Sequence, residues 1–398
     1  MSNRTIVAMP GDGIGKVVLD EAIRVLDKAG FSANYVEGDI GWEFWCSEGN
    51  PLPERTLDLI AEHKIGLFGA ITSKPKDEAF DELSPELKAK GLVYSSPIVG
   101  LRQHFGLDIC LRPCRTYKGN PLNFIRRGAN DTIDEPEIDV AIFRQNTEGL
   151  YGGVEWSNPP KNVYDALMSH PKFEKNFGET PVEEISVSTR IFTKKYTERI
   201  LRAAFEHAKK YDYESVTVCE KPNVIRETSG MMYKMAQQIQ KSDYPNIALW
   251  NTNIDAQMMW LTKNPENYGV IVAGNMFGDI VSDGFAGLIG GLGFATSAQY
   301  NPETGIGVFE PTHGSAPKYA DYETSIVNPI AMIETSCMML DFIDEQEIAK
   351  KIRKAVSEVI KEGNVQTYDM AKMSGRSDVI EKGAASTVQM AQAIIDKL

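Results

Sequence analysis

Cysteines and long apolar runs are scarce in this chain, and each shortage excludes a class of protein. Its 398 residues include five cysteines, Cys46, Cys110, Cys114, Cys219 and Cys337, with no C-x-x-C pair. This number and spacing predict neither a disulfide framework nor a zinc site. No run of roughly eighteen apolar residues occurs, so no membrane-spanning helix is expected. The first residues lead directly into a strand-like segment and predict no signal peptide. These features favour a cytoplasmic protein.

Basic residues are outnumbered by acidic ones, which restricts the partners that the chain can attract. The sequence contains 42 lysines and arginines against 55 aspartates and glutamates, a net charge of -13. Nucleic acid and anionic membranes repel such a chain, so neither is expected as a partner. An anionic substrate would require basic residues gathered at one place. Arg102, Arg112 and Arg144 lie in otherwise apolar segments, where a guanidinium can bind a carboxylate through two hydrogen bonds or pair with a structural acid.

Strand-like and helical segments alternate along the chain. The hydrophobic share is 42%, as in ordinary globular proteins, and the length suits two lobes. The alternation predicts an α/β fold with a largely parallel sheet. The predicted strands are 5–9, 33–36, 65–71, 184–188, 215–219, 246–250 and 270–273. The predicted helices are 16–29, 53–63, 194–211, 329–345, 346–362 and 387–398, of which 329–345 and 346–362 are expected to be amphipathic.

The glycine-rich segment GDGIG at residues 11–15 is partly similar to a dinucleotide-binding motif. The G-x-G-x-x-G fingerprint requires glycine at residue 16, where this chain has Lys16. A Rossmann fold is therefore not predicted, and the segment is interpreted as a tight turn between a strand and a helix.

Two segments lack the regular alternation. Residues 73–94 are rich in charge, and we expect a mobile loop or a short exposed helix beside the active site. Residues 155–182 are rich in Asn, Pro and Lys. They are expected to form an inserted arm, either a disordered loop or an interlocking dimer element.

Asp279 and Asp283 are the strongest candidates for a metal site. They follow a continuous apolar segment, 270–273, on a helix predicted to begin near Met276. Residues four apart lie on one face of a helix, where two carboxylates repel unless a positive charge lies between them. Mg2+ or Mn2+ would supply that charge, and two unrelated acids on a solvated helix face are the alternative. Lys221 at a strand end is a candidate base, or a solvated lysine.

Six motifs together resemble the β-decarboxylating dehydrogenases, the isocitrate and isopropylmalate dehydrogenase family, nearly end to end. They are PGDGIG at 10–15, LRQ and LRP within 101–113, FRQNTEGLY at 143–151, EKPNV at 220–224, NMFGDIVSDGFAGLIGGLG at 275–293 and FEPTHGSAP at 309–317. The resemblance implies a two-lobed α/β subunit without a Rossmann fold, working as a homodimer with shared active sites. It places the large domain at 1–107 and 293–398, the small domain at 108–148 and 194–292, and a clasp-like dimerisation arm at 149–193.

The resemblance also assigns roles to individual residues. Substrate carboxylates would be held by Ser96, Arg102, Arg112 and Arg144, and Mg2+ or Mn2+ by Asp279, Asp283 and the partner subunit's Asp255. The acid–base pair would be Tyr151 and the partner subunit's Lys221. In this chemistry, metal binding acidifies the C2 hydroxyl, hydride passes to the nicotinamide, CO2 is lost and Tyr151 protonates C3. The arginines orient the substrate so that only one carboxylate leaves.

The cofactor expected from the resemblance is NADP, with some use of NAD. The 2′-phosphate pocket would contain Lys318, Tyr319, Tyr368 and Lys372, the last standing where the bacterial NADP enzymes have arginine. Thr72, His313 and Asn328 would complete the nucleotide site. The alternative is that Lys318 and Lys372 are ordinary surface charges.

Isocitrate is the substrate that the resemblance favours, because the arm and the NADP-type residues are similar to those of isocitrate dehydrogenases. The expected reaction is oxidative decarboxylation to 2-oxoglutarate, as in the tricarboxylic acid cycle. Ile98 departs from the isocitrate pattern S-x-N-x-x-L-R and would favour an alkyl or longer substituent near the distal carboxylate, so 3-isopropylmalate and homoisocitrate remain alternatives. Regulation by phosphorylation of Ser96 is not expected. The alternative to an enzyme is a noncatalytic regulatory subunit of the same family, which would bind a ligand or a partner chain.

Overall fold

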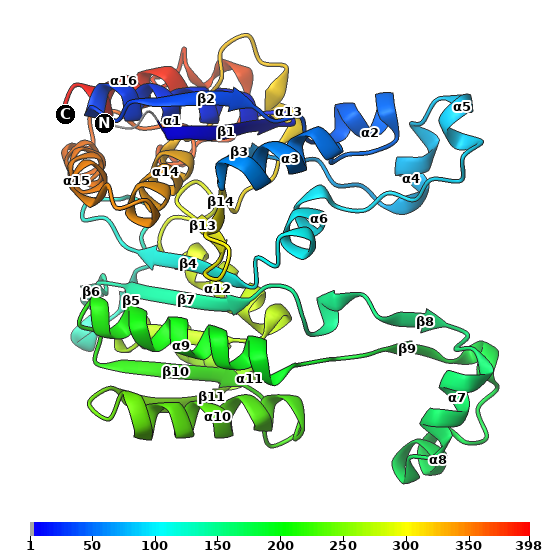
Figure 1. Ribbon diagram of the computed structural model, residues 1–398. Coiled ribbons are helices and arrows are strands. Elements are labelled where there is room, and N and C mark those ends of the chain that lie inside the picture. The colour runs from blue at the N-terminus through cyan, green and yellow to red at the C-terminus, as the bar shows by residue number, and fades with distance from the viewer. Residues whose placement is uncertain (1–3) are drawn as a thin grey trace.

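A single ten-stranded sheet organises the computed structural model, which describes residues 4–398 (Figure 1). The strand order is β11-β10-β12-β7-β4-β13-β14-β3-β1-β2. Neighbours are parallel except that β4 runs antiparallel to β7 and β13, and β13 antiparallel to β14, so the α/β prediction is confirmed. The strands are β1 Arg4–Gly11, β2 Ala33–Glu37, β3 Ile65–Ala70, β4 Ile109–Arg115, β7 Asp139–Gln145, β10 Ser215–Glu220, β11 Ala248–Asn253, β12 Val270–Ala273, β13 Thr296–Asn301 and β14 Ile306–Pro311. Two small hairpins pair β5 Arg126–Arg127 with β6 Ile133–Asp134, and β8 Glu155–Ser157 with β9 Ser186–Ser188.

Helices surround this sheet, and none of those within residues 4–398 combines the length and apolar character needed to cross a bilayer. In the first half of the chain they are α1 Gly15–Ala29, α2 Trp42–Glu48, α3 Glu54–His63, α4 Lys76–Asp81, α5 Pro85–Lys88, α6 Pro97–His104, α7 Lys161–Met168 and α8 Pro171–Phe177. In the second half they are α9 Lys194–Lys210, α10 Thr228–Asp243, α11 Ile254–Leu261, α12 Asn275–Leu288, α13 Pro317–Ala320, α14 Ile330–Phe342, α15 Gln346–Glu362 and α16 Thr387–Ile395.

The apolar core covers both faces of the sheet because side chains alternate along each strand. On β1, Ile6 and Ala8 join a core cluster with residues of α1, α12, α14, α15 and α16. Val7 and Met9, on the opposite face, join a second cluster beneath α3 and α6. A third cluster packs α9 and α10 against β7, β10 and β12. The first cluster spans both halves of the sheet and connects them into one body.

The expected amphipathic character of residues 329–345 is wrong. Every residue of α14 from Ile330 to Leu340 is buried, because the helix packs against α1, α15 and β14 at once. A helix enclosed on all sides has no solvated face and needs no amphipathic pattern. The following helix, α15, has the expected pattern and buries one side only.

The GDGIG segment forms the tight turn that the sequence predicts. Gly11 and Gly13 have φ angles of +69° and +57°, which favour glycine. A Cβ on Gly15 would lie 2.3 Å from the carbonyl oxygen of Pro10. The turn therefore brings α1 directly against the end of β1.

Residues 73–94 are not simply an exposed loop or helix, because part of this segment packs against α2. Leu83, Leu87 and Tyr94 join Trp45 in a buried cluster of their own, and Trp45 Nε1 donates a 2.8 Å hydrogen bond to the carbonyl of Ala79. Two helices, α4 and α5, lie in this segment. Figure 1 shows them beside α2, at the edge of the molecule away from the sheet.

The predicted arm extends from the body as the β8–β9 hairpin, with α7 and α8 at its far end (Figure 1). Neither of these two helices buries a residue within the chain. The domain boundaries given above stay a prediction, since the sheet runs through both halves without interruption.

A buried acid lies at the predicted domain boundary and pairs with an arginine that reaches across it. Asp108, which is 0% exposed, precedes β4 and accepts a 2.6 Å hydrogen bond from Arg199 of α9. Arg199 also pairs with Glu303, in the turn between β13 and β14, at 2.5 Å. Among the described residues, Asp108 Oδ2 has no hydrogen-bond partner. Burial raises the pKa of Asp108 to about 6, although Arg199 lowers it in part.

We expect Asp108→Asn to remove a component of the pH dependence of stability. The Asp108 pKa is about 6 in the folded chain against an ordinary 3.8, so in this window the folded state retains a proton that the unfolded state has released. The wild-type free energy of unfolding should therefore fall as pH rises, by up to about 1.4 kcal/mol per pH unit. Urea denaturation of both proteins between about pH 4 and 7 measures the difference in slope, and equal slopes would contradict this prediction.

Candidate active site

The acid pair lies on α12, close to two adjacent strands. Helix α12 follows β12, as the sequence predicts, and begins at Asn275. A Cβ on Gly278 would lie 2.8 Å from Cβ of Arg144, so this glycine lets the first turn of α12 approach β7. Asp279 and Asp283 follow on the same face of the helix.

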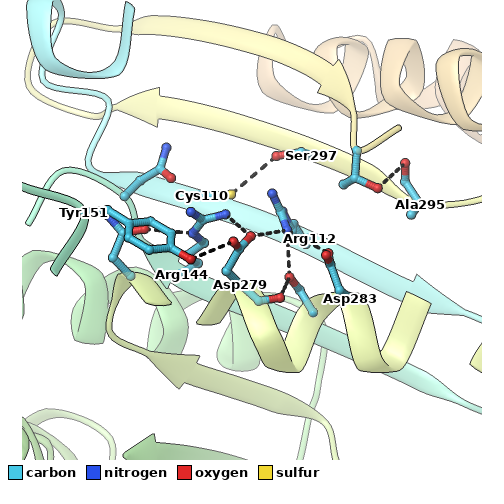
Figure 2. A network of polar contacts seen from close by, with 12 residues as sticks. Cys110, Arg112, Arg144, Tyr151, Asp279, Asp283, Ala295 and Ser297 are labelled. Atoms are coloured by element: carbon cyan, nitrogen blue, oxygen red, sulfur yellow. Dashed lines mark hydrogen bonds and ion pairs between the residues drawn. The ribbon is translucent and has the colours of Figure 1, made fainter. Parts of the chain in front are cut away.

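Two buried arginines face these acids (Figure 2). Arg112 Nη1 donates to Asp279 Oδ1 at 3.1 Å and to Asp283 Oδ1 at 3.2 Å, and Arg144 pairs with the same oxygen of Asp279. Arg144 Nε donates to Asn275 Oδ1 at 3.0 Å. Burial, and then the charge of Arg112, lower the pKa of Arg144 to about 10, so it remains a cation at neutral pH. The two predicted arginines and two predicted aspartates are therefore brought together.

The acid pair fits a hard divalent cation. The Asp279 and Asp283 side chains are 30% and 60% exposed, and carboxylate oxygens are the ligands that Mg2+ and Mn2+ prefer. No cluster of three or more His, Cys, Asp or Glu residues suited to a metal occurs within the part of the chain that the structure describes. One chain therefore offers two of the three predicted metal ligands at one place.

Tyr151 lies beside the acid pair. Its hydroxyl is 3.4 Å from Asp279 Oδ2, and its ring is 5.6 Å from the guanidinium carbon of Arg144. Burial, and then the charge of Asp279, raise the pKa of Tyr151 above its ordinary value of 10. The hydroxyl is therefore protonated at neutral pH and can serve as a proton donor.

Lys221 and Asp255 lie together, but not in this cluster. Lys221 follows β10, Asp255 lies in the first turn of α11, and their side chains form an ion pair. Its hydrogen bond to Lys221 lowers the pKa of Asp255. Across residues 4–398, no hydrogen bond or ion pair joins Lys221 to Tyr151 or Asp279. Within one chain, the predicted acid–base pair is therefore not assembled.

Arg102 contacts polar residues that sequence reasoning missed. It donates to Gln299 Oε1 at 2.5 Å and to Glu310 Oε1 at 3.2 Å. Asn146 donates to the same oxygen of Gln299 at 2.9 Å. Burial raises the pKa of Glu310, although Arg102 lowers it in part. An acid within the apolar strand Ile306–Pro311 was the signal that could have revealed Glu310, since a buried carboxylate needs a partner.

Helix α6 presents a different apolar residue from the one expected. Ile98 is 9% exposed and packs in the core cluster beneath α6, so the expectation that Ile98 faces the substrate is not supported. Val99 is 37% exposed and precedes Arg102 by three residues, which makes the two side chains neighbours on the helix surface. Ser96, the residue preceding α6, is half-buried.

Part of the predicted nucleotide site gathers around the GDGIG turn. Thr72 Oγ1 and Ser315 Oγ are 2.7 Å apart. Asp12 accepts 2.7 Å hydrogen bonds from the backbone nitrogens of Thr72 and Trp42. His313 lies in the same FEPTHGSAP segment, and burial lowers its pKa, which keeps its ring neutral at neutral pH.

Three of the four predicted 2′-phosphate residues also lie together. The rings of Tyr319 and Tyr368 are 5.5 Å apart, and Lys318 Nζ lies 5.2 Å from the centre of the Tyr319 ring. Lys372 is exposed, with φ +54°. Asn328 is buried and donates to Asp369 at 3.1 Å.

The fold is α/β, with antiparallel pairing confined to β4, β7, β13 and β14. Buried arginines facing an acid pair suit a protein that binds carboxylic acids together with a metal. A sequence profile described as isocitrate/isopropylmalate dehydrogenase matches residues 5–394. The chain therefore belongs to this family of oxidative decarboxylating dehydrogenases, and the predicted family is confirmed.

Named relatives agree on the family and differ in substrate. The chain is 38% identical over 393 residues to the protein DlpA of Legionella pneumophila, covering 98% of this chain and 58% of that longer protein. It is 36% identical over 360 residues to a 3-isopropylmalate dehydrogenase of Archaeoglobus fulgidus, covering 90% and 92% of the two chains. Others are named homoisocitrate dehydrogenase, at 36% identity, and isocitrate dehydrogenase [NADP], at 31%.

The fold is similar to that of a solved isocitrate dehydrogenase from Methylococcus capsulatus. The two structures superimpose with a TM-score of 0.79 at 32% identity, over 99% of both chains. The predicted fold class, an α/β fold of the isocitrate/isopropylmalate dehydrogenase type, is thereby confirmed.

We expect Asp283→Asn to weaken Mn2+ binding by at least about tenfold, because an amide supplies no negative charge to the cation. Titration of the purified protein followed by electron paramagnetic resonance of free Mn2+ measures this directly. Asp243→Asn is the matched control, since Asp243 pairs with Arg202 and lies outside the acid pair. Equal affinity in all three proteins would contradict a metal site at Asp283.

Proposed function

We propose that the protein oxidises and decarboxylates isocitrate to 2-oxoglutarate and CO2, with NADP as hydride acceptor and Mg2+ or Mn2+ as metal. The observation that carries this proposal is the contact of Arg112 and Arg144 with Asp279, with Asp283 one turn further along α12. Arginines suit substrate carboxylates, and the acids suit the cation that a 2-hydroxy acid would chelate.

Different residues would bind the substrate, hold the cation and transfer protons. Arg102, Arg112 and Arg144 would hold the carboxylates and fix which one is lost. When bound, the cation would lower the pKa of the substrate hydroxyl and withdraw electron density during CO2 loss. Lys221 of the partner subunit would accept the hydroxyl proton, and Tyr151, whose raised pKa keeps it protonated, would deliver a proton to C3.

Val99 supports a second candidate substrate class. It is the exposed apolar side chain beside Arg102 on α6, where the substituent at C3 of the substrate would lie. A polar carboxymethyl group gains nothing from such a neighbour, whereas an alkyl or longer chain does. 3-Isopropylmalate and homoisocitrate are therefore retained as alternatives.

The proposed cofactor preference depends on Lys318, Tyr319, Tyr368 and Lys372. Tyr319 and Tyr368 contact each other and Lys318 lies beside Tyr319; with the exposed Lys372, they would provide an aromatic surface and positive charge for the 2′-phosphate. Lysine attracts phosphate as a point charge, without the two-pronged grip of arginine. We therefore propose preference for NADP with residual use of NAD.

We also propose that the protein is a homodimer whose two active sites are each built from both subunits. We propose a cytoplasmic location. Lys221 and Asp255 pair with each other away from the acid pair, and α7 and α8 of the arm bury nothing within the chain. A second copy that covered the arm would bring its own Lys221 and Asp255 to the first copy's acid pair.

A substrate and cofactor panel tests the proposed reaction. With Mn2+, we expect kcat/KM to be highest for isocitrate with NADP, lower with NAD, and lost on addition of EDTA. Isocitrate, homoisocitrate and 3-isopropylmalate should each be assayed with both cofactors. Greater activity on 3-isopropylmalate or homoisocitrate would assign the substrate class that Val99 favours, and no activity on any acid would favour a regulatory subunit.

Complementation tests whether active sites are shared. Lys221→Met and Asp279→Asn should each inactivate the protein. Refolding the two variants together should restore about a quarter of wild-type activity, because about half of the dimers are mixed and each of these has one complete site. A mixture that remained inactive while forming mixed dimers would place Lys221 and Asp279 in the same chain's site.

A further inference from the structure

Glu220 is a fully buried carboxylate to which the assigned chemistry gives no role. It ends β10 immediately before Lys221 and is 0% exposed. Arg190 Nη2 donates to its two oxygens at 3.0 and 2.8 Å, and Ser229 Oγ donates at 2.5 Å. The backbone nitrogen of Gly274 donates at 2.8 Å. Four hydrogen bonds thus converge on one buried charge.

The partners of Glu220 come from separate parts of the fold. Arg190 lies at the base of the arm, after β9, and Ser229 lies in α10. Gly274 is the residue immediately before α12, the helix that carries Asp279 and Asp283. The carboxylate therefore connects the arm, the strand that ends at Lys221 and the start of the acid-bearing helix.

Close packing fixes the geometry of this connection. Arg190 Nη1 also donates to Thr228 and Ser229, at 3.0 and 2.9 Å, and its guanidinium lies 4.5 Å from the ring centre of Phe192. A Cβ on Gly274 would lie 2.6 Å from Glu220 Oε1, so glycine allows the carboxylate to reach the backbone nitrogen. A negative charge at this end of α12 is also favoured by the helix dipole.

A buried ion pair of this kind is a weak source of stability, because removing both charges from water offsets most of their attraction. Removing one partner is different, since it leaves the other charge buried without compensation. The pair therefore adds little net stability, while its buried charges join the elements that carry them. The elements it holds carry Lys221 on one side and the acid pair on the other.

We propose that Glu220 and Arg190 are positioning residues that fix Lys221 and α12 relative to the base of the arm. This inference rests on the proposed function. If active sites are shared between subunits, Lys221 serves the partner's site while Asp279 and Asp283 serve their own. The Glu220–Arg190 pair then connects groups that belong to two different active sites.

Glu220→Gln tests the inference with two readouts. We expect Mn2+ affinity and kcat each to fall about tenfold or more, with little change in KM for the hydroxy acid, because the arginines that bind it are untouched. Mn2+ binding is measured directly by electron paramagnetic resonance, without turnover. Arg190→Gln should act in the same direction, and the double variant should be no worse than either single one, since both remove the same interaction.

Glu334→Gln is the matched control. Glu334 is buried in α14 and pairs with Arg353 at 3.4 Å, so its loss should lower Tm without changing Mn2+ affinity or kcat. All assays are made below the Tm of each variant, with near-ultraviolet circular dichroism as the check of native packing.

The outcomes separate this inference from the proposed function. A natively packed Glu220→Gln protein with wild-type Mn2+ affinity and kcat would overturn the positioning role alone. A wild-type protein that binds Mn2+ but turns over no hydroxy acid would remove the proposed reaction, and the Mn2+ comparison would still decide the inference. A wild-type protein that binds no Mn2+ would overturn both.

Discussion

One guanidinium between two carboxylates is the interaction on which this site depends. Asp279 and Asp283 would repel each other at their spacing on α12, and Arg112 would be a costly charge in the interior without acids nearby. Arg112 Nη1 lies 3.1 and 3.2 Å from the two acids and satisfies both requirements. A substrate carboxylate binding to Arg112, and a cation binding to the acids, would each replace a partner with another of the same charge. Each charged side chain of the site would therefore keep a partner of opposite charge when such ligands bind.

The sheet determines how these charges meet. Cys110 on β4 is opposite Arg144 on β7, and Arg112 lies two residues beyond Cys110, so both arginines emerge on the same face. Gln299 on β13 is also opposite Cys110, and it contacts Arg102 from α6. The site is consequently built at the seam where β4 joins one half of the sheet to the other. A relative movement of the halves would change the distance between Arg102 and the other two arginines.

Local patterns in the sequence were sufficient for much of the fold. The failed glycine fingerprint at Lys16 excluded a Rossmann fold, and the apolar segment 270–273 located the strand before the acid-bearing helix. The character of α14 was missed because burial on all sides depends on how α1, α15 and β14 pack around it. That packing, above all with the N-terminal α1, is not visible in the local sequence. Ile98 was misplaced for a related reason, since the sequence shows that a residue is apolar but not which face of a short helix meets the core. The partners of Arg102 were missed because Gln299 and Glu310 reach it from remote strands.

In the proposed dimer, the arm would account for why one chain assembles only part of the predicted site. Its helices α7 and α8 bury no residue, whereas apolar helix faces in water normally require a partner surface. The base of the arm is nevertheless held firmly, because Arg190 pairs with the buried Glu220 and the backbone of Gly149 bonds to that of Ile191. A rigid base with an uncovered end is the arrangement expected of an element that grips a second copy. The foot of the arm adjoins Lys221. In the proposed dimer, the contact that covers the arm would therefore also bring Lys221 to the acid pair of the neighbouring subunit.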